Sequence, residues 1–260
     1  VVFGKGKSRS LVSSIMHWSF GAIIIGSLSA TNTWDYPTYL FIGCCGIAWP
    51  YFNANYSVDR VSIADCLGKI CLLVTLASLC FLPYSTWYGA SYTKLQIWRG
   101  STTPILAYFQ VHGLFLFLVI GFLFGETRNL IRYRYIDLFD DRSKFIGISL
   151  VSGLILLVIP GLVLFVSGVV IGPVILAVAT WSSFLILMPV QNDGKKICFG
   201  LISIALLLTL FVEIVRLDGD ISRMNTVFKF YLQVWTLFSV VGGVALAWLV
   251  GQANALSYRS

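Results

Sequence analysis

Residues 201–250, "LISIALLLTLFVEIVRLDGDISRMNTVFKFYLQVWTLFSVVGGVALAWLV", join two long apolar runs through one short charged stretch. Each run, with its flanking residues, approaches the roughly 20 apolar residues that cross a hydrocarbon layer about 30 Å thick. This pattern predicts two transmembrane helices, near residues 196–212 and 226–251. The charged stretch then lies at a membrane boundary.

The rest of the chain repeats this pattern. Of the 260 residues, 58% are hydrophobic and only 11% are charged, which excludes an ordinary soluble domain. We expect an all-α, polytopic transmembrane helix bundle of about eight spans, forming a single transmembrane domain over residues 1–260. Pro160 and Pro173 interrupt one apolar run that is too long for a single crossing, which predicts a hairpin near Ser167. The six further helices are predicted near residues 11–29, 36–52, 62–82, 104–124, 145–166 and 169–189.

The basic residues report orientation. The net charge of +7 lies in short connections between apolar runs, so it favours a topology signal and argues against a nucleic-acid partner. Eight alternating spans place thirteen of the 18 Lys and Arg residues on the side of both termini, which predicts that both termini are cytoplasmic. The five on the outer side are Lys94, Arg99, Arg216, Arg223 and Lys229.

Three segments rich in polar and aromatic residues are thereby assigned to the outer face. They are residues 31–37 ("TNTWDYP"), residues 83–104 and the charged stretch at 213–231. Residues 125–144 fall on the cytoplasmic side, where we expect a solvated, mixed-charge connector.

The charged stretch contains chemistry for a phosphorylated substrate. Asp218 and Asp220 flank a glycine, so their carboxylates are candidate ligands of a divalent cation. Arg216, Arg223 and Lys229 are candidate phosphate ligands. The alternative is that these charges pair with one another, with Asp218 or Asp220 favouring the N-terminus of the last helix.

Polar residues also enter two predicted helices. Asn225, Lys229 and Gln233 are spaced four apart and share one helix face, where they serve either a site or helix–helix hydrogen bonds. His112 lies near the middle of its span, one turn after Tyr108, and is a candidate for proton handling or a polar substrate. The alternative is a neutral His112 bonded to a neighbouring helix.

Asp35 has two competing explanations. Asp35 precedes Tyr36-Pro37, so it suits the first turn of a helix. Alternatively, Asp35 with Asn32 and Trp34 lines a pocket in which the indole stacks on a sugar and the polar groups bind hydroxyls. His17, with Gly21 one turn later, predicts close helix packing.

Three motifs together resemble a known family. "TNTWDYPTYL" (31–40), "HGLFLFL" (112–118) and "RMNTVFKFYLQVW" (223–235) are similar, in this order, to the later half of the YYY-domain (DUF2298) multi-spanning membrane proteins. The upstream tyrosine-rich and "DLHAH"-like motifs of that family do not occur, so the chain resembles its C-terminal portion only. The motif positions are Asn32, Trp34, Asp35, Arg223, Asn225, Lys229 and Tyr231.

This resemblance implies a relation by fold to C-type glycosyltransferases, which take a sugar from a polyprenyl-phosphate carrier on the outer face. The first hypothesis is therefore part of such an enzyme, located in a prokaryotic cytoplasmic membrane. In it, Arg216, Arg223 and Lys229 hold the carrier phosphate, and Asp35, Asp218 or Asp220 acts as a base or binds metal. The alternative is a non-catalytic subunit that packs among other subunits of a respiratory or photosynthetic membrane complex.

Overall fold

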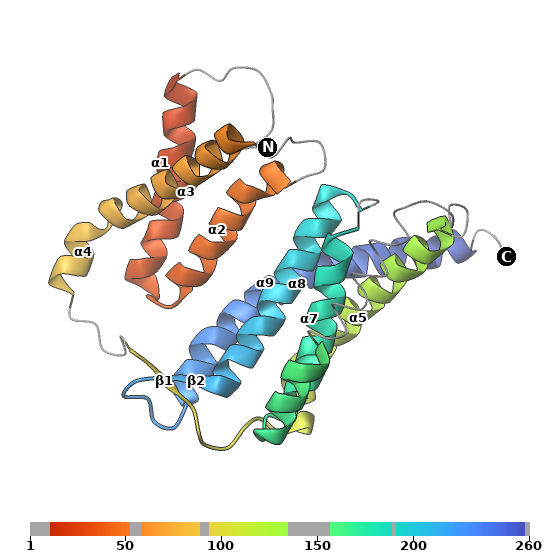
Figure 1. Ribbon diagram of the computed structural model, residues 1–260. Coiled ribbons are helices and arrows are strands. Elements are labelled where there is room, and N and C mark those ends of the chain that lie inside the picture. Colours follow the sequence, from red (N-terminus) through yellow and green to blue (C-terminus); the bar gives the residue numbers. More distant parts are fainter. Residues whose placement is uncertain (1–10, 53–58, 89–93, 135–156, 189–190, 258–260) are drawn as a thin grey trace. The chain divides into compact units, whose positions relative to one another are not determined.

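The computed structural model describes residues 11–52, 59–88, 94–134, 157–188 and 191–257, and these are overwhelmingly helical. The all-α prediction is confirmed. The chain forms two compact units, Val1–Ser91 and Tyr92–Ser260, called here unit one and unit two. Each is a group of helices drawn in Figure 1, and each is described by itself.

Unit one is built around a close approach of its first and third helices. A Cβ added to Gly26 would lie 2.6 Å from the carbonyl oxygen of Ala77, so only glycine permits this spacing. The packing predicted around His17 and Gly21 is wrong, because His17 is exposed and nothing lies within 4 Å of a Cβ at Gly21. The elements of unit one are α1 (Leu11–Thr31), α2 (Asp35–Phe52), α3 (Arg60–Cys80) and α4 (Leu82–Trp87).

Unit two packs its helices around α8 (Asp193–Ile214). In the most apolar stretch of α8, 56% of the residues are buried. In Figure 1, α7 and α8 run alongside each other, and α9 packs against α8 and α5. A two-stranded antiparallel sheet lies where α8 ends. The other elements are β1 (Leu95–Ile97), α5 (Ile105–Arg134), a helix over Leu157–Val166, α7 (Gly172–Ile186), β2 (Val215–Leu217) and α9 (Met224–Ser257).

The hairpin predicted near Ser167 is confirmed. The helix Leu157–Val166 ends there, and Gly168 adopts φ +87°, a left-handed conformation that favours glycine. The Val169 amide donates to the Leu164 carbonyl, and α7 begins at Gly172. Residues 145–156, the predicted start of the preceding span, lie outside the described residues.

The cytoplasmic connector predicted at 125–144 is wrong in its first part, because residues 125–134 continue α5. Polar side chains in this part of α5 have partners on other helices, and these contacts stabilise the continued helix. Glu126 is 1% exposed and pairs with Lys195 on α8 at 2.7 Å. The Thr127 hydroxyl accepts the Trp181 indole N–H at 2.8 Å. Residues 135–144 are not among those described.

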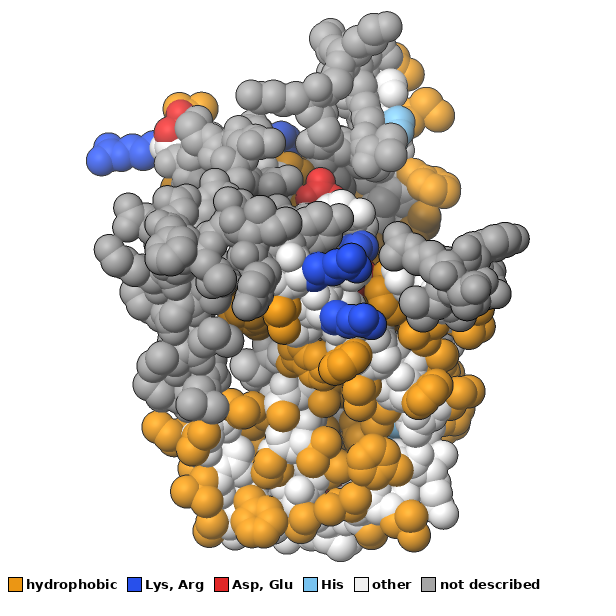
Figure 2. Space-filling view, turned by 90° about the vertical axis from the view of Figure 1, so that its right-hand side faces the viewer, with side chains coloured by type: hydrophobic (Ala, Val, Ile, Leu, Met, Phe, Trp, Pro, Cys, Tyr) orange, Lys and Arg blue, Asp and Glu red, His pale blue; other side chains and the backbone are white. Residues whose placement is uncertain are grey.

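Membrane-spanning character is clear in five helices that are long and apolar enough to cross a bilayer. Figure 2 shows hydrophobic side chains over most of the described surface on one face. The predicted count of eight spans stays a prediction, since α2, α7 and the helix Leu157–Val166 fall short of this criterion within the described residues. The five spans are Val12–Thr31, Arg60–Cys80, Ile105–Arg132, Asp193–Ile214 and Met224–Gln252.

Candidate functional site

The candidate site is organised by the small sheet at the boundary end of unit two. Gln96 pairs with Arg216, so the sheet joins residues 120 positions apart. Two further backbone bonds extend it: Asp218 donates to the Lys94 carbonyl at 2.8 Å, and Trp98 donates to the Ile214 carbonyl at 2.7 Å. The sequence interpretation missed this sheet, because three-residue strands carry too little alternation to identify a distant partner.

One face of the sheet collects polar and aromatic groups. Side chains two residues apart on a strand share a face, which groups Gln96 with Trp98 and Arg216 with Asp218. We call these four residues the polar sheet face. The Arg216 guanidinium donates to the side-chain oxygen Oε1 of Gln96 at 3.0 and 3.2 Å, and the side-chain Nε2 of Gln96 donates to Asp218 Oδ1 at 2.7 Å. Arg216 also lies over the Trp98 ring, 5.6 Å from its centroid.

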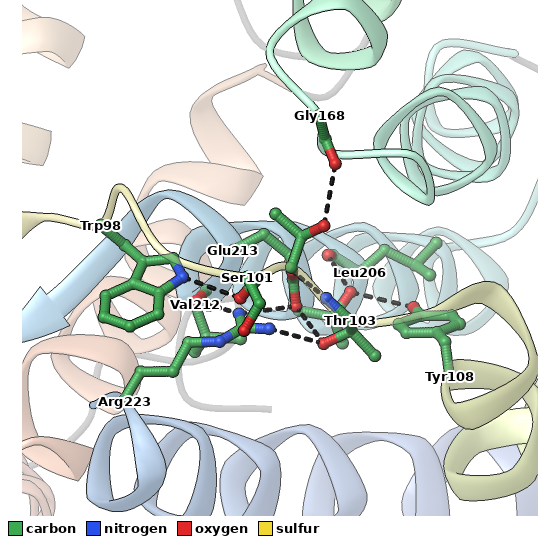
Figure 3. Close-up of polar contacts among 11 residues, drawn as sticks. Trp98, Ser101, Thr103, Tyr108, Gly168, Leu206, Val212, Glu213 and Arg223 are labelled. Carbon is green, nitrogen blue, oxygen red and sulfur yellow. Dashed lines mark hydrogen bonds and ion pairs between the residues drawn. The ribbon is translucent and has the colours of Figure 1, made fainter. Parts of the chain in front are cut away.

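Beneath this face lies a buried ion pair. Arg223 Nη1 lies 2.9 Å from Glu213 Oε1, and their side chains are 11% and 1% exposed. The Thr103 backbone N–H and hydroxyl both donate to the Glu213 carboxylate, at 2.8 and 2.6 Å. Arg223 also donates to the Val212 carbonyl and the Thr103 hydroxyl (Figure 3). Both charges are therefore paired and hydrogen-bonded, as burial demands.

The segment between β1 and α5 links this ion pair to the rest of unit two. The Trp98 indole donates to the Ser101 carbonyl at 3.0 Å, and its ring lies 5.9 Å from the Arg223 guanidinium carbon. The Thr102 hydroxyl donates to the Gly168 carbonyl at 2.8 Å (Figure 3). Residues 98–103 thus connect the sheet, the hairpin and the starts of α5 and α9.

Asp220 is used in the turn that leads into α9. Its carboxylate accepts the backbone N–H groups of Asn225 and Thr226 at 3.1 and 2.8 Å, and the Thr226 hydroxyl at 2.7 Å. Burial raises the pKa of this carboxyl, but the hydrogen bonds from Thr226 and Asn225 outweigh burial and hold the pKa below its ordinary value. The capping role considered for Asp220 therefore has direct geometric support.

Replacing Asp220 by Ala is expected to lower the free energy of unfolding by about 2 kcal/mol at neutral pH, the upper range for loss of a helix cap. The folded-state pKa is depressed, so this contribution is present above the ordinary carboxyl pKa and is lost as pH falls through the folded-state value. Denaturation of the detergent-solubilised protein at several pH values measures this difference. A difference between wild type and variant that persists unchanged at pH about 2 would contradict the assignment.

The candidate residues of unit one lie in the turn between α1 and α2. Asn32 follows the end of α1, and its side-chain amide donates to Asp35 Oδ1 at 2.8 Å. The Asp35 backbone N–H donates to the Asn32 carbonyl at 2.8 Å, and α2 begins at Asp35. Trp34 completes this turn. The first-turn position of Asp35 predicted from the sequence is confirmed.

The remaining candidates lie on the first turns of α9. Asn225 donates its backbone N–H to Asp220, and Lys229 is half-buried one turn further on. Tyr231 contacts the His112 ring edge-to-face, with 4.6 Å between centroids. Within the part of the chain that the structure describes, no three His, Cys, Asp or Glu side chains group closely enough to hold a metal ion. The divalent cation stays a prediction.

Comparison with known proteins is limited to one family. The model of the family described as "Uncharacterized membrane protein (DUF2298)" matches residues 1–238. No curated protein and no solved structure matches the chain. The matched residues include four of the five candidate spans in full, and the fifth, Met224–Gln252, as far as residue 238. The chain is an integral membrane protein and belongs to the DUF2298 family of uncharacterized membrane proteins.

Proposed function

We propose that this chain is part of a glycosyltransferase that uses lipid-linked sugars on the extracytoplasmic side of a prokaryotic cytoplasmic membrane. The supporting observation is the polar sheet face at the end of two membrane helices. It offers a guanidinium, an amide and a carboxylate joined by hydrogen bonds, and an indole in cation–π contact with the guanidinium. Arginine binds phosphate oxygens in a fork, and amides and carboxylates bind sugar hydroxyls.

In this proposal one charged residue has a structural role and two bind the carrier phosphate. Arg223 is bound by Glu213, Thr103 and the Val212 carbonyl, so its guanidinium is held in place against the Trp98 ring. Arg216 is half-buried and closer to solvent, which makes it the better candidate for the carrier phosphate. Lys229 is a second cation on α9 for the same anionic group.

Acid–base chemistry is assigned to exposed or half-buried carboxylates in this proposal. Asp220 accepts three hydrogen bonds at the start of α9, which leaves Asp218 on the polar sheet face as the stronger candidate of this pair for a sugar hydroxyl. Asp35 on α2 is retained as the alternative base. A base must come within hydrogen-bonding distance of the acceptor hydroxyl that it deprotonates.

Arg216→Ala is expected to weaken binding of a polyprenyl monophosphate by about tenfold, because one charge-assisted bidentate contact is lost. The measurement compares the native, full-length protein in nanodiscs with polyprenyl monophosphate and with the uncharged polyprenol. Arg216→Lys should retain part of the affinity. Arg99→Ala, at an exposed position outside the polar sheet face, is the matched control and should bind within about twofold of wild type.

A second readout addresses transfer itself. Surface glycans of the native host are compared between wild type, Arg216→Ala and Arg99→Ala at equal protein abundance. A selective loss of glycans in Arg216→Ala supports the proposal. Unchanged glycans in both variants, together with loss of a co-purifying membrane complex, would overturn it in favour of a non-catalytic subunit.

A further inference from the structure

The contact between α5 and α9 contains a histidine that the described part of the chain leaves without hydrogen bonds. His112 lies on α5, about 10 Å along the helix from Ile105, and is 0% exposed. Neither ring nitrogen has a hydrogen-bond partner among the described residues. Buried polar groups are nearly always hydrogen-bonded, and in a lipid environment an unpaired one is especially costly.

A second polar group comes from the facing helix. Tyr231 on α9 contacts His112 edge-to-face at 4.6 Å between ring centroids. Its hydroxyl is buried and lies near Thr103 without a hydrogen bond of ordinary geometry. Two helices therefore bring unsatisfied polar atoms to the same layer of the bundle.

The surrounding aromatic groups do not supply what His112 needs. Tyr108 lies 4.8 Å from the imidazole centroid, but its hydroxyl is bonded to Thr209, which itself donates to the Leu206 carbonyl. Phe238 lies 6.3 Å away and has no polar atom. An imidazole N–H can point at the Tyr231 ring, yet the other nitrogen of a neutral imidazole is an acceptor and still requires a donor.

We propose that His112 and Tyr231 form a binding site for a hydroxyl group between α5 and α9. A hydroxyl is both donor and acceptor, so it can serve the acceptor nitrogen of His112 and the Tyr231 phenol at once. Two sources share this chemistry: a water molecule and the hydroxyl of a sugar or other alcohol. The site uses none of the four residues of the polar sheet face and does not depend on glycosyl transfer.

Selective labelling makes the test direct, because the chain contains only two histidines. Histidine labelled with nitrogen-15 is incorporated into the protein, which is purified in a detergent without hydroxyl groups. His17→Asn, at an exposed position, removes the other signal and so assigns His112. The measured quantities are the two ring-nitrogen shifts and their contacts with exchangeable protons.

The expected result is a neutral His112 whose acceptor nitrogen shows the shift of a hydrogen-bonded nitrogen. Contacts to exchangeable protons other than the Tyr231 phenol proton in this detergent identify water as the source. Contacts that arise only after octyl glucoside is added identify a sugar hydroxyl. Tyr231→Phe should then move the His112 resonances and weaken those contacts, whereas the exposed substitution Phe228→Leu on the same helix should not.

An acceptor nitrogen with the shift of an unbonded imidazole, both before and after addition of octyl glucoside, would overturn the proposal. The wild-type spectra decide this point by themselves, so misfolding of a variant does not affect it. Failure of the Arg216 binding experiment would leave this outcome unchanged, and the reverse also holds.

Discussion

Glu213→Gln is expected to lower the free energy of unfolding of unit two by about 3 to 5 kcal/mol, the usual cost of breaking a buried ion pair. The substitution keeps the size of the side chain and removes its charge. Arg223, only 11% exposed, would then retain its positive charge with neutral partners. Denaturation in mixed micelles, followed by tryptophan fluorescence, measures the change.

The control removes both charges. Glu213→Gln combined with Arg223→Met is expected to recover a substantial part of the loss, because no unpaired charge is left buried. Asp218→Asn, on the half-buried polar sheet face, should change stability by less than about 0.5 kcal/mol. A Glu213→Gln protein within about 1 kcal/mol of wild type would show that Arg223 does not depend on Glu213 for charge compensation.

Gly26→Ala is expected to destabilise unit one by about 1 to 3 kcal/mol through overpacking. The added methyl group would lie 2.6 Å from the Ala77 carbonyl oxygen and equally close to the Phe81 ring. A backbone atom cannot rotate away as a side chain does, so α1 and α3 must separate. The measurement is the denaturation midpoint of the solubilised protein.

Gly21→Ala is the matched control for this prediction. It lies five residues earlier on α1, with nothing within 4 Å of the added methyl group. Alanine has the higher helix propensity, so this variant should be as stable as wild type or more stable by up to about 1 kcal/mol. Equal effects at Gly21 and Gly26 would contradict close packing at Gly26.

The helices could be predicted from the sequence because apolar length is a local signal. The ends of α1, α2 and α8 lie within a few residues of their predicted limits. The extension of α5 to Arg134 could not be predicted this way. It depends on Lys195 and Trp181, which are distant in sequence and pair with Glu126 and Thr127.

The sequence singled out the charged stretch as a candidate, but it did not predict how that stretch is organised. The charge density of residues 213–231 drew attention to this stretch, and both parts of the pairing-and-capping alternative have a counterpart: Asp220 caps the turn before α9, and Arg223 pairs with Glu213. The phosphate and metal alternative stays a prediction. The parts contributed by Thr103 and Trp98 were missed, because backbone pairing between β1 and β2 brings them to the site. No pattern within 98–103 indicates that pairing.

The pairing of β1 with β2 also sets an order for biosynthesis. Gln96 leaves the ribosome 120 residues before Arg216, which at about 5 to 20 residues per second is a delay of roughly 6 to 24 s. During that interval the backbone groups of β1, which precedes α5 in the chain, lack their partner strand. Unpaired strand edges of this kind are sites of pairing with wrong segments. Correct pairing therefore requires that this edge stay unoccupied until β2 has been synthesised.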